Sequence, residues 1–356
     1  MKQLTLCLAF LTLLIISGCS PMSELTSEEL PESEKDVAYT LIYYVHADSD
    51  YLYHTTDNKP IRQNSKVLET AFDVGETALS GEVFIYHQRS EKKLLGLFPR
   101  RSSRFYHYKG GQLVTQVKYR HQDKNEDLFA TEVQLMNQYK SQDRSDNHQN
   151  YFVYFGHELP TENGKGYHQS LPEIAVSTTS FARGIQKFLL SDEDRFDLIV
   201  LSTCNNGTPS MVNLLMPLSV AVLASPQNLH LSHIDSASMN LLEMEPGISP
   251  FELGRSMAEQ TFQQLKETVQ TTITLALYDL NEVQPYIDEL TSITYSNRPP
   301  ERTVQFQDNV DCTVIYPSEP DLHRQGVETW YKPARFGRQS GQSTHSGWGC
   351  KPNPDN

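Results

Sequence analysis

One cysteine and one histidine, which together can perform nucleophilic chemistry, each follow a short apolar run. Cys204 comes after FDLIVLST, and His157 comes after YFVYFG, 47 positions earlier. A cysteine acts as a nucleophile in its thiolate form, and a nearby imidazole can accept the thiol proton. Free cysteines are also common as inert buried residues, and a histidine at the end of a strand is often only hydrogen-bonded. Both interpretations, chemistry and packing, remain open on these residues alone.

The hydrophobic pattern indicates which elements position the two residues. Nearly continuous β-favouring runs predict strands at 39–46, 82–87, 151–156, 196–202, 271–278 and 311–316. Helical spacing predicts helices at 128–139, 179–190, 208–216, 250–266 and 280–290, with a β-hairpin insertion within 94–120. Such alternation predicts an α/β fold in three layers, with helices on both faces of a mostly parallel central sheet. Sites in such sheets lie outside the carboxyl ends of the strands, where His157 and Cys204 both fall.

The amino-terminal residues predict export. Lys2 precedes a largely apolar run over residues 4–16 that ends in small residues, as in a secretory signal. Its end, Ile-Ser-Gly-Cys, resembles the lipobox of bacterial lipoproteins, which predicts a signal peptide at 1–18 and a lipidated Cys19. An ordinary signal peptide is the alternative, but it leaves this cysteine unexplained. Ser20, directly after this cysteine, resembles the residue at that position in lipoproteins sent to the outer membrane. We therefore expect a lipid-anchored protein of the bacterial cell envelope, and this resemblance alone implies the outer membrane as its location.

Composition bounds the rest of the chain. The net charge of −14 argues against a nucleic-acid-binding surface. Residues 19–38 are acidic and polar and predict a flexible tether, 39–337 suit one domain, and the Gly- and Ser-rich 338–356 predict a disordered tail. Five cysteines do not form a disulfide framework, although Cys312 and Cys350 could pair in an oxidising compartment.

Other patterns give weaker signals. His230 and His233 lie three apart in HLSH, but no HExxH or CxxC accompanies them, so we predict no metal site. No phosphate loop, dinucleotide fingerprint or GxSxG elbow occurs, and we predict no cofactor.

The order of several segments resembles the clostripain-like cysteine peptidases, which share the caspase-type fold. The segments are TLIYYVHADSD, YFVYFGHE, FDLIVLSTCNNGTPSMVNLL, VAVLASPQN, TTITLALYDLNEVQPYIDEL and CTVIYPSEP. They span about residues 38–320, and their order is more specific than any one of them.

The resemblance implies roles for particular residues. It implies Cys204 as the nucleophile of an acyl-enzyme mechanism and His157 as the proton acceptor. The backbone N–H groups of Glu158 and Cys204 would form the oxyanion hole, and the substrate would be a peptide or protein. We assign Ser202, Ser225 and Asp235 to a substrate pocket, Asp235 as a substitute pocket acid.

Two residues depart from the family pattern. Glu158 stands where the family has glycine, and its carboxylate would oppose a developing oxyanion. Ser202 stands where the family has an aspartate. The resemblance implies that this aspartate forms part of a pocket for basic side chains. The sequence therefore supports two hypotheses: a membrane-anchored cysteine endopeptidase, or a catalytically inactive caspase-like envelope lipoprotein that serves as a binding or assembly module.

Overall fold

The computed structural model describes residues 36–48, 52–54, 60–90, 92–94, 98–100, 102–120, 127–162, 164–191, 193–229, 233–296, 308–317 and 321–352. The predicted signal peptide, Cys19 and most of the predicted tether lie outside the described residues. Asp36–Asn356 group into one compact unit. Among the described helices, none is both long enough and apolar enough to cross a membrane.

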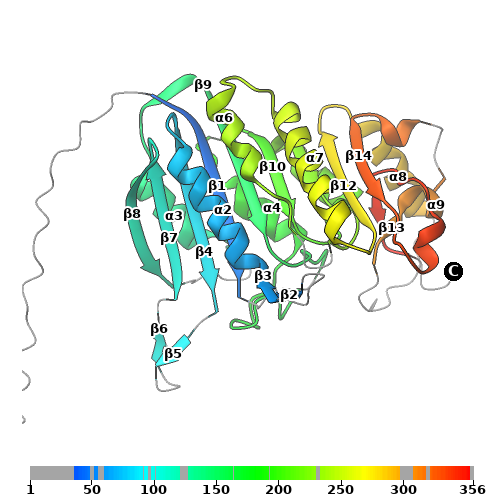
Figure 1. Cartoon of the computed structure of the whole chain (residues 1–356), viewed down its shortest axis with the longest axis horizontal. Helices are drawn as coiled ribbons and strands as arrows, with labels where there is room; N and C mark the ends of the chain where they lie inside the picture. Colours follow the sequence, from blue (N-terminus) through cyan, green and yellow to red (C-terminus); the bar gives the residue numbers. More distant parts are fainter. Residues whose placement is uncertain are drawn as a thin grey trace, which may run out of the picture. The chain divides into compact units, whose positions relative to one another are not determined.

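A nine-stranded sheet forms the centre of this unit (Figure 1). Its strands lie in the order β14 (Val327–Lys332), β12 (Ile273–Asp279), β11 (Ser219–Ala224), β10 (Phe196–Ser202), β9 (Arg144–Phe155), β1 (Val37–Ala47), β4 (Gly81–Arg89), β7 (Ser103–Lys109) and β8 (Gln112–Tyr119). Neighbours from β11 to β4 are parallel, whereas both edges are extended by antiparallel strands. We call β11, β10, β9, β1 and β4 the parallel core.

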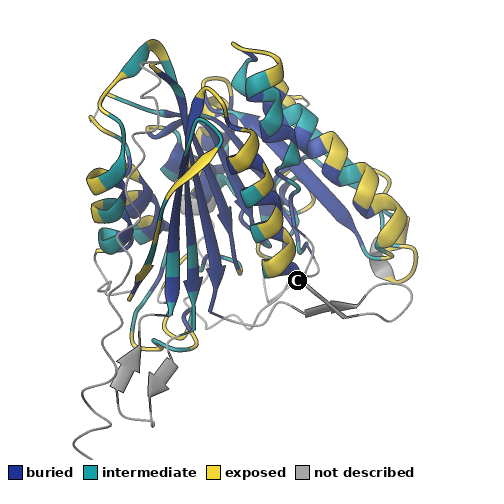
Figure 2. Cartoon of the chain, turned by 60° about the vertical axis from the view of Figure 1, so that its left-hand side comes forward, coloured by how far each residue is buried: buried dark blue, intermediate teal, exposed yellow. Residues whose placement is uncertain are grey.

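Helices cover both faces of the sheet. Two separate apolar clusters, one on each face, are formed by side chains that alternate along the strands. One face packs against α2 (Gln63–Thr77), α6 (Leu241–Met244) and α7 (Pro250–Thr268), and the other against α3 (Ala130–Tyr139), α4 (Thr178–Gln186), α5 (Pro209–Leu215) and α8 (Gln284–Ser296). Figure 2 shows buried strands between helices whose outer sides are exposed. The predicted three-layer α/β/α architecture is confirmed.

Short elements complete the described structure. They are β2 (Leu52–His54), β3 (Pro60–Arg62), β5 (Lys92–Leu94), β6 (Phe98–Arg100), η1 (Ala237–Asn240), β13 (Val310–Asp311), α9 (Cys312–Ile315), η2 (Leu322–Arg324), η3 (Arg338–Gly341) and β15 (Gly349–Cys350).

The strand predicted at 311–316 is wrong for most of its length. Strand β13 ends at Asp311, and the helical turn α9 follows. The Asp311 carboxylate accepts a hydrogen bond from the backbone N–H of Thr313 at 3.0 Å, which caps the helical turn. A local side-chain contact thus overrides the β-favouring pattern of the residues.

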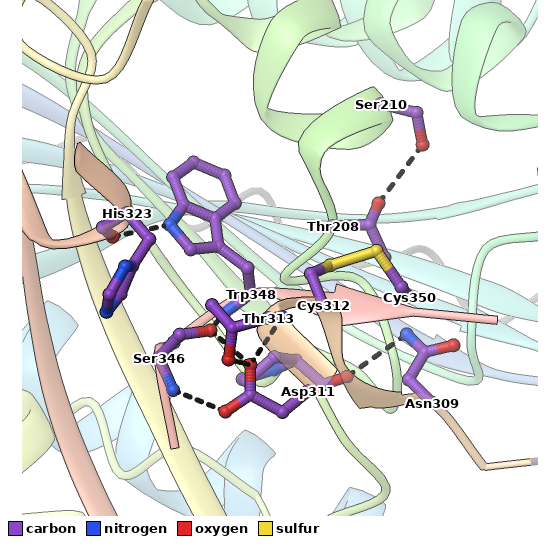
Figure 3. The surroundings of a disulfide bond; sticks show 12 residues. Thr208, Ser210, Asn309, Asp311, Cys312, Thr313, His323, Ser346, Trp348 and Cys350 are labelled. Atoms are coloured by element: carbon purple, nitrogen blue, oxygen red, sulfur yellow. Dashed lines mark hydrogen bonds between the residues drawn. A yellow bond between two sulfur atoms is a disulfide. The ribbon is translucent and has the colours of Figure 1, made fainter. Parts of the chain in front are cut away.

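The tail predicted to be disordered is instead packed in part, because residues 345 and 347–349 are buried, while 353–356 lie outside the described residues. Cys312 and Cys350 form a disulfide, and β15 pairs with β13. Trp348 is fully buried, and its indole N–H donates to the carbonyl oxygen of His323 at 2.9 Å (Figure 3). One tryptophan and one disulfide therefore order a segment whose overall composition is polar.

Candidate active site

The register of the parallel core places His157 and Cys204 at the same level of one sheet edge. Strands β9 and β10 are adjacent and parallel, and Phe155 pairs with Ser202. The backbone N–H of Gly156 continues this pairing by donating to the Ser202 oxygen at 3.4 Å. His157 and Cys204 each come two residues after a paired position, on chains that run about 4.8 Å apart in a sheet. The structure brings these two predicted site residues to neighbouring strand ends.

The sulfur of Cys204 lies in a polar environment. Cys204 is half-buried and is the one free cysteine among the described residues. Its thiol donates to Asn228 Oδ1 at 3.0 Å, and the backbone N–H of Leu229 donates to the sulfur at 3.4 Å. The N–H that points at sulfur favours the thiolate, whereas the bond to Asn228 Oδ1 favours the thiol. Sequence reasoning missed Asn228, although its place just after β11, the next parallel strand, was the available signal.

The turn after Cys204 links the two strand ends. Asn205 adopts a left-handed conformation with φ 55°, which asparagine tolerates better than most residues. The buried side chain of Asn206 accepts from Leu159 N–H at 2.9 Å and donates to the Leu159 oxygen at 3.1 Å. Asn206 therefore fixes the chain that follows His157 against the chain that follows Cys204.

This turn also packs against the disulfide-linked segment, by which we mean residues 308–317 and 342–352. Asn309 Nδ2 donates to the Asn205 oxygen at 3.1 Å, and Gly349 N–H donates to the Gly207 oxygen at 2.9 Å. A Cβ at Gly349 would lie 2.2 Å from the Pro226 oxygen, so this close approach requires glycine. Residues 104 positions apart thus hold the turn that follows the predicted nucleophile.

His157 can accept a proton near neutral pH. Its side chain is exposed, yet the protein around the strand end removes part of its water and so lowers its pKa from the usual value. A histidine with a lowered pKa is mainly neutral at pH 7. The carbonyl oxygen of His157 accepts a hydrogen bond from the Tyr167 hydroxyl at 3.2 Å, which restrains the backbone at this position.

The carboxylate of Glu158 has two partners. Glu158 Oε2 accepts from Asn205 Nδ2 at 2.7 Å, and Oε1 lies 2.7 Å from Lys351 Nζ. The ammonium group of Lys351 offsets the negative charge that the sequence predicts to oppose an oxyanion. Lys351 was not identified from the sequence, because it lies in the tail that composition predicts to be disordered.

The three residues assigned to a substrate pocket lie in different environments. Ser202 is buried, and its hydroxyl accepts from the backbone N–H of Ile234 at 2.8 Å. Ser225 is fully buried, and its hydroxyl lies within hydrogen-bond distance of the carbonyl oxygens of Gln227 and Thr274. Asp235 is half-buried, which makes it the most accessible of the three. Its carboxylate accepts a hydrogen bond from Ala237 N–H at 3.0 Å.

The histidines of HLSH are divided by the structure. His230 lies outside the described residues, and His233 is buried, which lowers its pKa.

A cavity of about 400 Å³ opens beside Glu158, Asn205 and Lys351, at the start of α5. Neither His157 nor Cys204 lines this cavity. We therefore do not assign it to the substrate.

Comparison with known proteins identifies the fold. No protein-family model and no curated protein sequence matches the chain. An inactive zymogen C11 protease from Parabacteroides distasonis matches in structure with a TM-score of 0.53 and 11% sequence identity, over 88% of this chain and 91% of that chain. The chain has the fold of the C11 proteases. A secreted C11 cysteine protease from Bacteroides thetaiotaomicron matches with a TM-score of 0.50 and 10% identity, over 73% of this chain and 70% of that chain.

The C11 fold accounts for the way in which the two candidate residues are presented. Clostripain-like proteases are C11 proteases, so the fold expected from the resemblance is confirmed. The C11 fold here contains the parallel core, whose carboxyl edge carries both His157 and Cys204.

Proposed function

We propose that this chain is a clostripain-like cysteine endopeptidase that is anchored through a lipid at Cys19 and cleaves peptides or proteins outside the cytoplasm. The observation that carries the proposal is the level register of β9 and β10 on a C11 fold, because His157 and Cys204 each come two residues after the end of these strands. A histidine and a cysteine on adjacent strand ends are the two groups that an acyl-enzyme mechanism requires.

The mechanism follows from the surroundings of the two residues. His157 accepts the thiol proton, and the thiolate of Cys204 attacks the scissile carbonyl carbon. The backbone N–H groups of Glu158 and Cys204 stabilise the oxyanion, and the protonated His157 then gives its proton to the leaving amine. Water, deprotonated by His157, hydrolyses the thioester and regenerates the thiol. The N–H of Leu229 near the sulfur would stabilise the thiolate after His157 has accepted the proton.

The position of Ser202 bears on specificity. A buried hydroxyl that bonds to the backbone of Ile234 offers no negative charge to a basic substrate side chain. Asp235, the assigned substitute acid, is the one negatively charged residue of the three assigned to the pocket, but it is half-buried and its carboxylate already accepts from a backbone N–H. We therefore expect preference for a neutral rather than a basic residue before the scissile bond. The disulfide between Cys312 and Cys350 supports a location outside the cytoplasm, because such bonds persist in oxidising compartments.

Labelling by peptidyl acyloxymethyl ketones tests the peptidase. The full chain, purified in detergent, is treated with a panel of these reagents that differ in the residue before the reactive group. We expect labelling with neutral members, its loss in Cys204→Ala, and a reduction of about 100-fold or more in His157→Gln. His148→Gln, in the amino-terminal half of β9, is the matched control and should label normally. A folded chain that no member labels would instead support the inactive binding module.

The lipid anchor is tested separately. Incorporation of an alkynyl fatty acid into the chain in the cell, with its loss in Cys19→Ser, is the expected result. Equal incorporation in both proteins would contradict anchoring at Cys19.

A further inference from the structure

Three buried metal-ligand side chains meet at the carboxyl end of β1, one strand away from His157. They are His46 and Asp48, at and just after the end of the strand, and His168, in the chain that follows β9. One ligand atom from each lies within 4.8 Å of the other two. The exposed fractions of the three residues are 0%, 1% and 4% in that order, so water does not solvate them.

The contacts converge on one ring nitrogen. Nδ1 of His168 lies 3.1 Å from His46 Nε2 and 3.9 Å from Asp48 Oδ2. A hydrogen bond between the two imidazoles explains the first distance, but the second is too long for a hydrogen bond. Among the described residues, His168 is the one ion-pair partner of the Asp48 carboxylate. A buried carboxylate is costly without a compensating cation, so hydrogen bonding between neutral groups accounts for only part of the cluster.

Gln88, on the neighbouring strand β4, presents an amide to the same nitrogen. Its Nε2 lies 3.5 Å from His168 Nδ1, while its buried Oε1 has no hydrogen-bond partner among the described residues. A half-turn of the amide exchanges these two atoms. The carbonyl oxygen would then face the cluster as a fourth ligand and be satisfied by the cation, while the amide nitrogen would take the position that now lacks a partner.

We propose that His46, Asp48 and His168 bind one divalent zinc-type cation, with Gln88 Oε1 completing the site. Two imidazoles and a carboxylate are ligands that suit zinc. Tetrahedral zinc with bonds of about 2.0–2.1 Å places its ligand atoms about 3.3 Å apart. The separations of 3.1 and 3.9 Å from His168 Nδ1 lie near this value, whereas the widest separation, up to 4.8 Å, must shorten by about 1.5 Å when the ion binds. Ser170 donates its N–H and its hydroxyl to the Asp48 carboxylate at 3.0 and 2.6 Å, which orients this ligand.

The proposed cation would restrain the backbone of His157. Tyr167, the neighbour of His168, stacks on the ring of His46 with centroids 4.8 Å apart. Its hydroxyl bonds to the Tyr154 hydroxyl at 2.6 Å and to the carbonyl oxygen of His157 at 3.2 Å. The metal would thus tie β1 to the chain after β9 and hold His157 at the sheet edge. This positioning role rests on the proposed function, whereas the metal site itself does not.

No motif in the sequence indicates this site. His46 and Asp48 lie 122 and 120 positions before His168, so no motif spacing brings them together. The sequence alone predicts no metal site, so the fold is what brings these three residues together.

Zinc titration of the full chain in a Cys204→Ala background tests the site. This background removes the thiol, so zinc bound at the candidate catalytic pair does not confuse the result. We expect one tightly bound zinc ion per chain and at least about 10-fold weaker binding in Asp48→Asn and in His168→Gln. His107→Gln, which alters a buried histidine bonded to Glu82 on the neighbouring strands, is the matched control and should leave zinc binding unchanged. Equal zinc affinity in Asp48→Asn and its parent, or no zinc bound by the folded parent, would overturn the site.

Hydrogen exchange separates the site from its effect on His157. With zinc, we expect slower exchange of backbone amides across 157–170, and no such change in Asp48→Asn. Zinc binding without slower exchange would overturn the positioning role. Because this measurement uses Cys204→Ala, failure of the proposed peptidase activity leaves its outcome unaffected.

Discussion

The parallel core and the disulfide-linked segment are stabilised by different interactions. In the core, Phe152 is fully buried among Phe181, Phe188 and Phe196, with ring centroids 5.6 to 6.3 Å apart. Such packing arises from area removed from water, which the apolar runs of the strands supply. In the disulfide-linked segment, short polar contacts and a covalent bond replace much of that packing.

Asp311 illustrates the second kind of stabilisation. Its carboxylate accepts from Ser346 N–H at 2.7 Å and from Thr313 N–H at 3.0 Å (Figure 3). Burial favours the protonated form, but nearby His345 and these hydrogen bonds outweigh it, so the pKa of Asp311 is lowered. A carboxylate that remains ionised can hold this segment together at neutral pH.

The parallel core and the disulfide-linked segment make different contributions to the candidate site. The parallel core brings Cys204 and His157 to one edge, as the strand register requires. The disulfide-linked segment fixes the turn after Cys204 and offsets the charge of Glu158. Changes in the core should therefore act on the whole fold, whereas changes in the disulfide-linked segment should act on the chemistry at Cys204.

The largest effect on stability is expected in the core. Phe152→Ala should lower the free energy of unfolding by about 3–5 kcal/mol, because it removes a buried ring and leaves a cavity. Urea-induced unfolding measures this change. Leu113→Ala, at an exposed position on β8, is the control and should change stability by less than about 0.5 kcal/mol. Similar losses in both variants would contradict the assignment of Phe152 to a packed core.

An intermediate effect is expected from removal of the disulfide. The double change Cys312→Ala and Cys350→Ala should lower the free energy of unfolding by about 2–4 kcal/mol. At temperatures where this variant stays folded, the labelling rate of Cys204 should fall by roughly 10-fold or more, because the turn at Asn205 loses its support. Labelling at the parent rate, despite lower stability, would show that the disulfide-linked segment does not control the turn.

Much of the fold could be predicted from the sequence because its strands carry local patterns. The runs at 39–46 and 196–202 became β1 and β10 within two residues at each end. Strand β14 was missed, because VETWYK mixes charged and aromatic residues and has no continuous apolar run. Local pattern therefore identified the buried strands and failed at this edge strand and in the disulfide-linked segment.

The candidate site could be predicted only in part, for a related reason. His157 and Cys204 are marked by the strands that precede them, and a parallel sheet brings such strand ends together. Asn228 follows a strand that local pattern marks, but its contact with Cys204 depends on the order of strands in the sheet. Lys351 reaches the site through a packed tail, which the spacing of residues does not reveal. The residues that could react can be identified from the sequence, and the fold adds those that hold them.

The smallest effect on stability is expected from a change at Lys351. Such a change tests the charge of the disulfide-linked segment separately from its contribution to stability. Lys351→Met removes a partly exposed ion pair with Glu158, so the free energy of unfolding should change by no more than about 1 kcal/mol. The uncompensated Glu158 carboxylate should nevertheless slow labelling of Cys204 by roughly three- to tenfold, because it opposes the oxyanion.

A double-mutant cycle with Glu158→Gln identifies the cause. Glutamine keeps an oxygen for Asn205 Nδ2 and removes the charge, so Lys351→Met should have no further effect on labelling in that background. If Lys351→Met slows labelling equally in both backgrounds, Lys351 does not act through Glu158. The disulfide-linked segment would then influence Cys204 through the position of the turn and not through its charge.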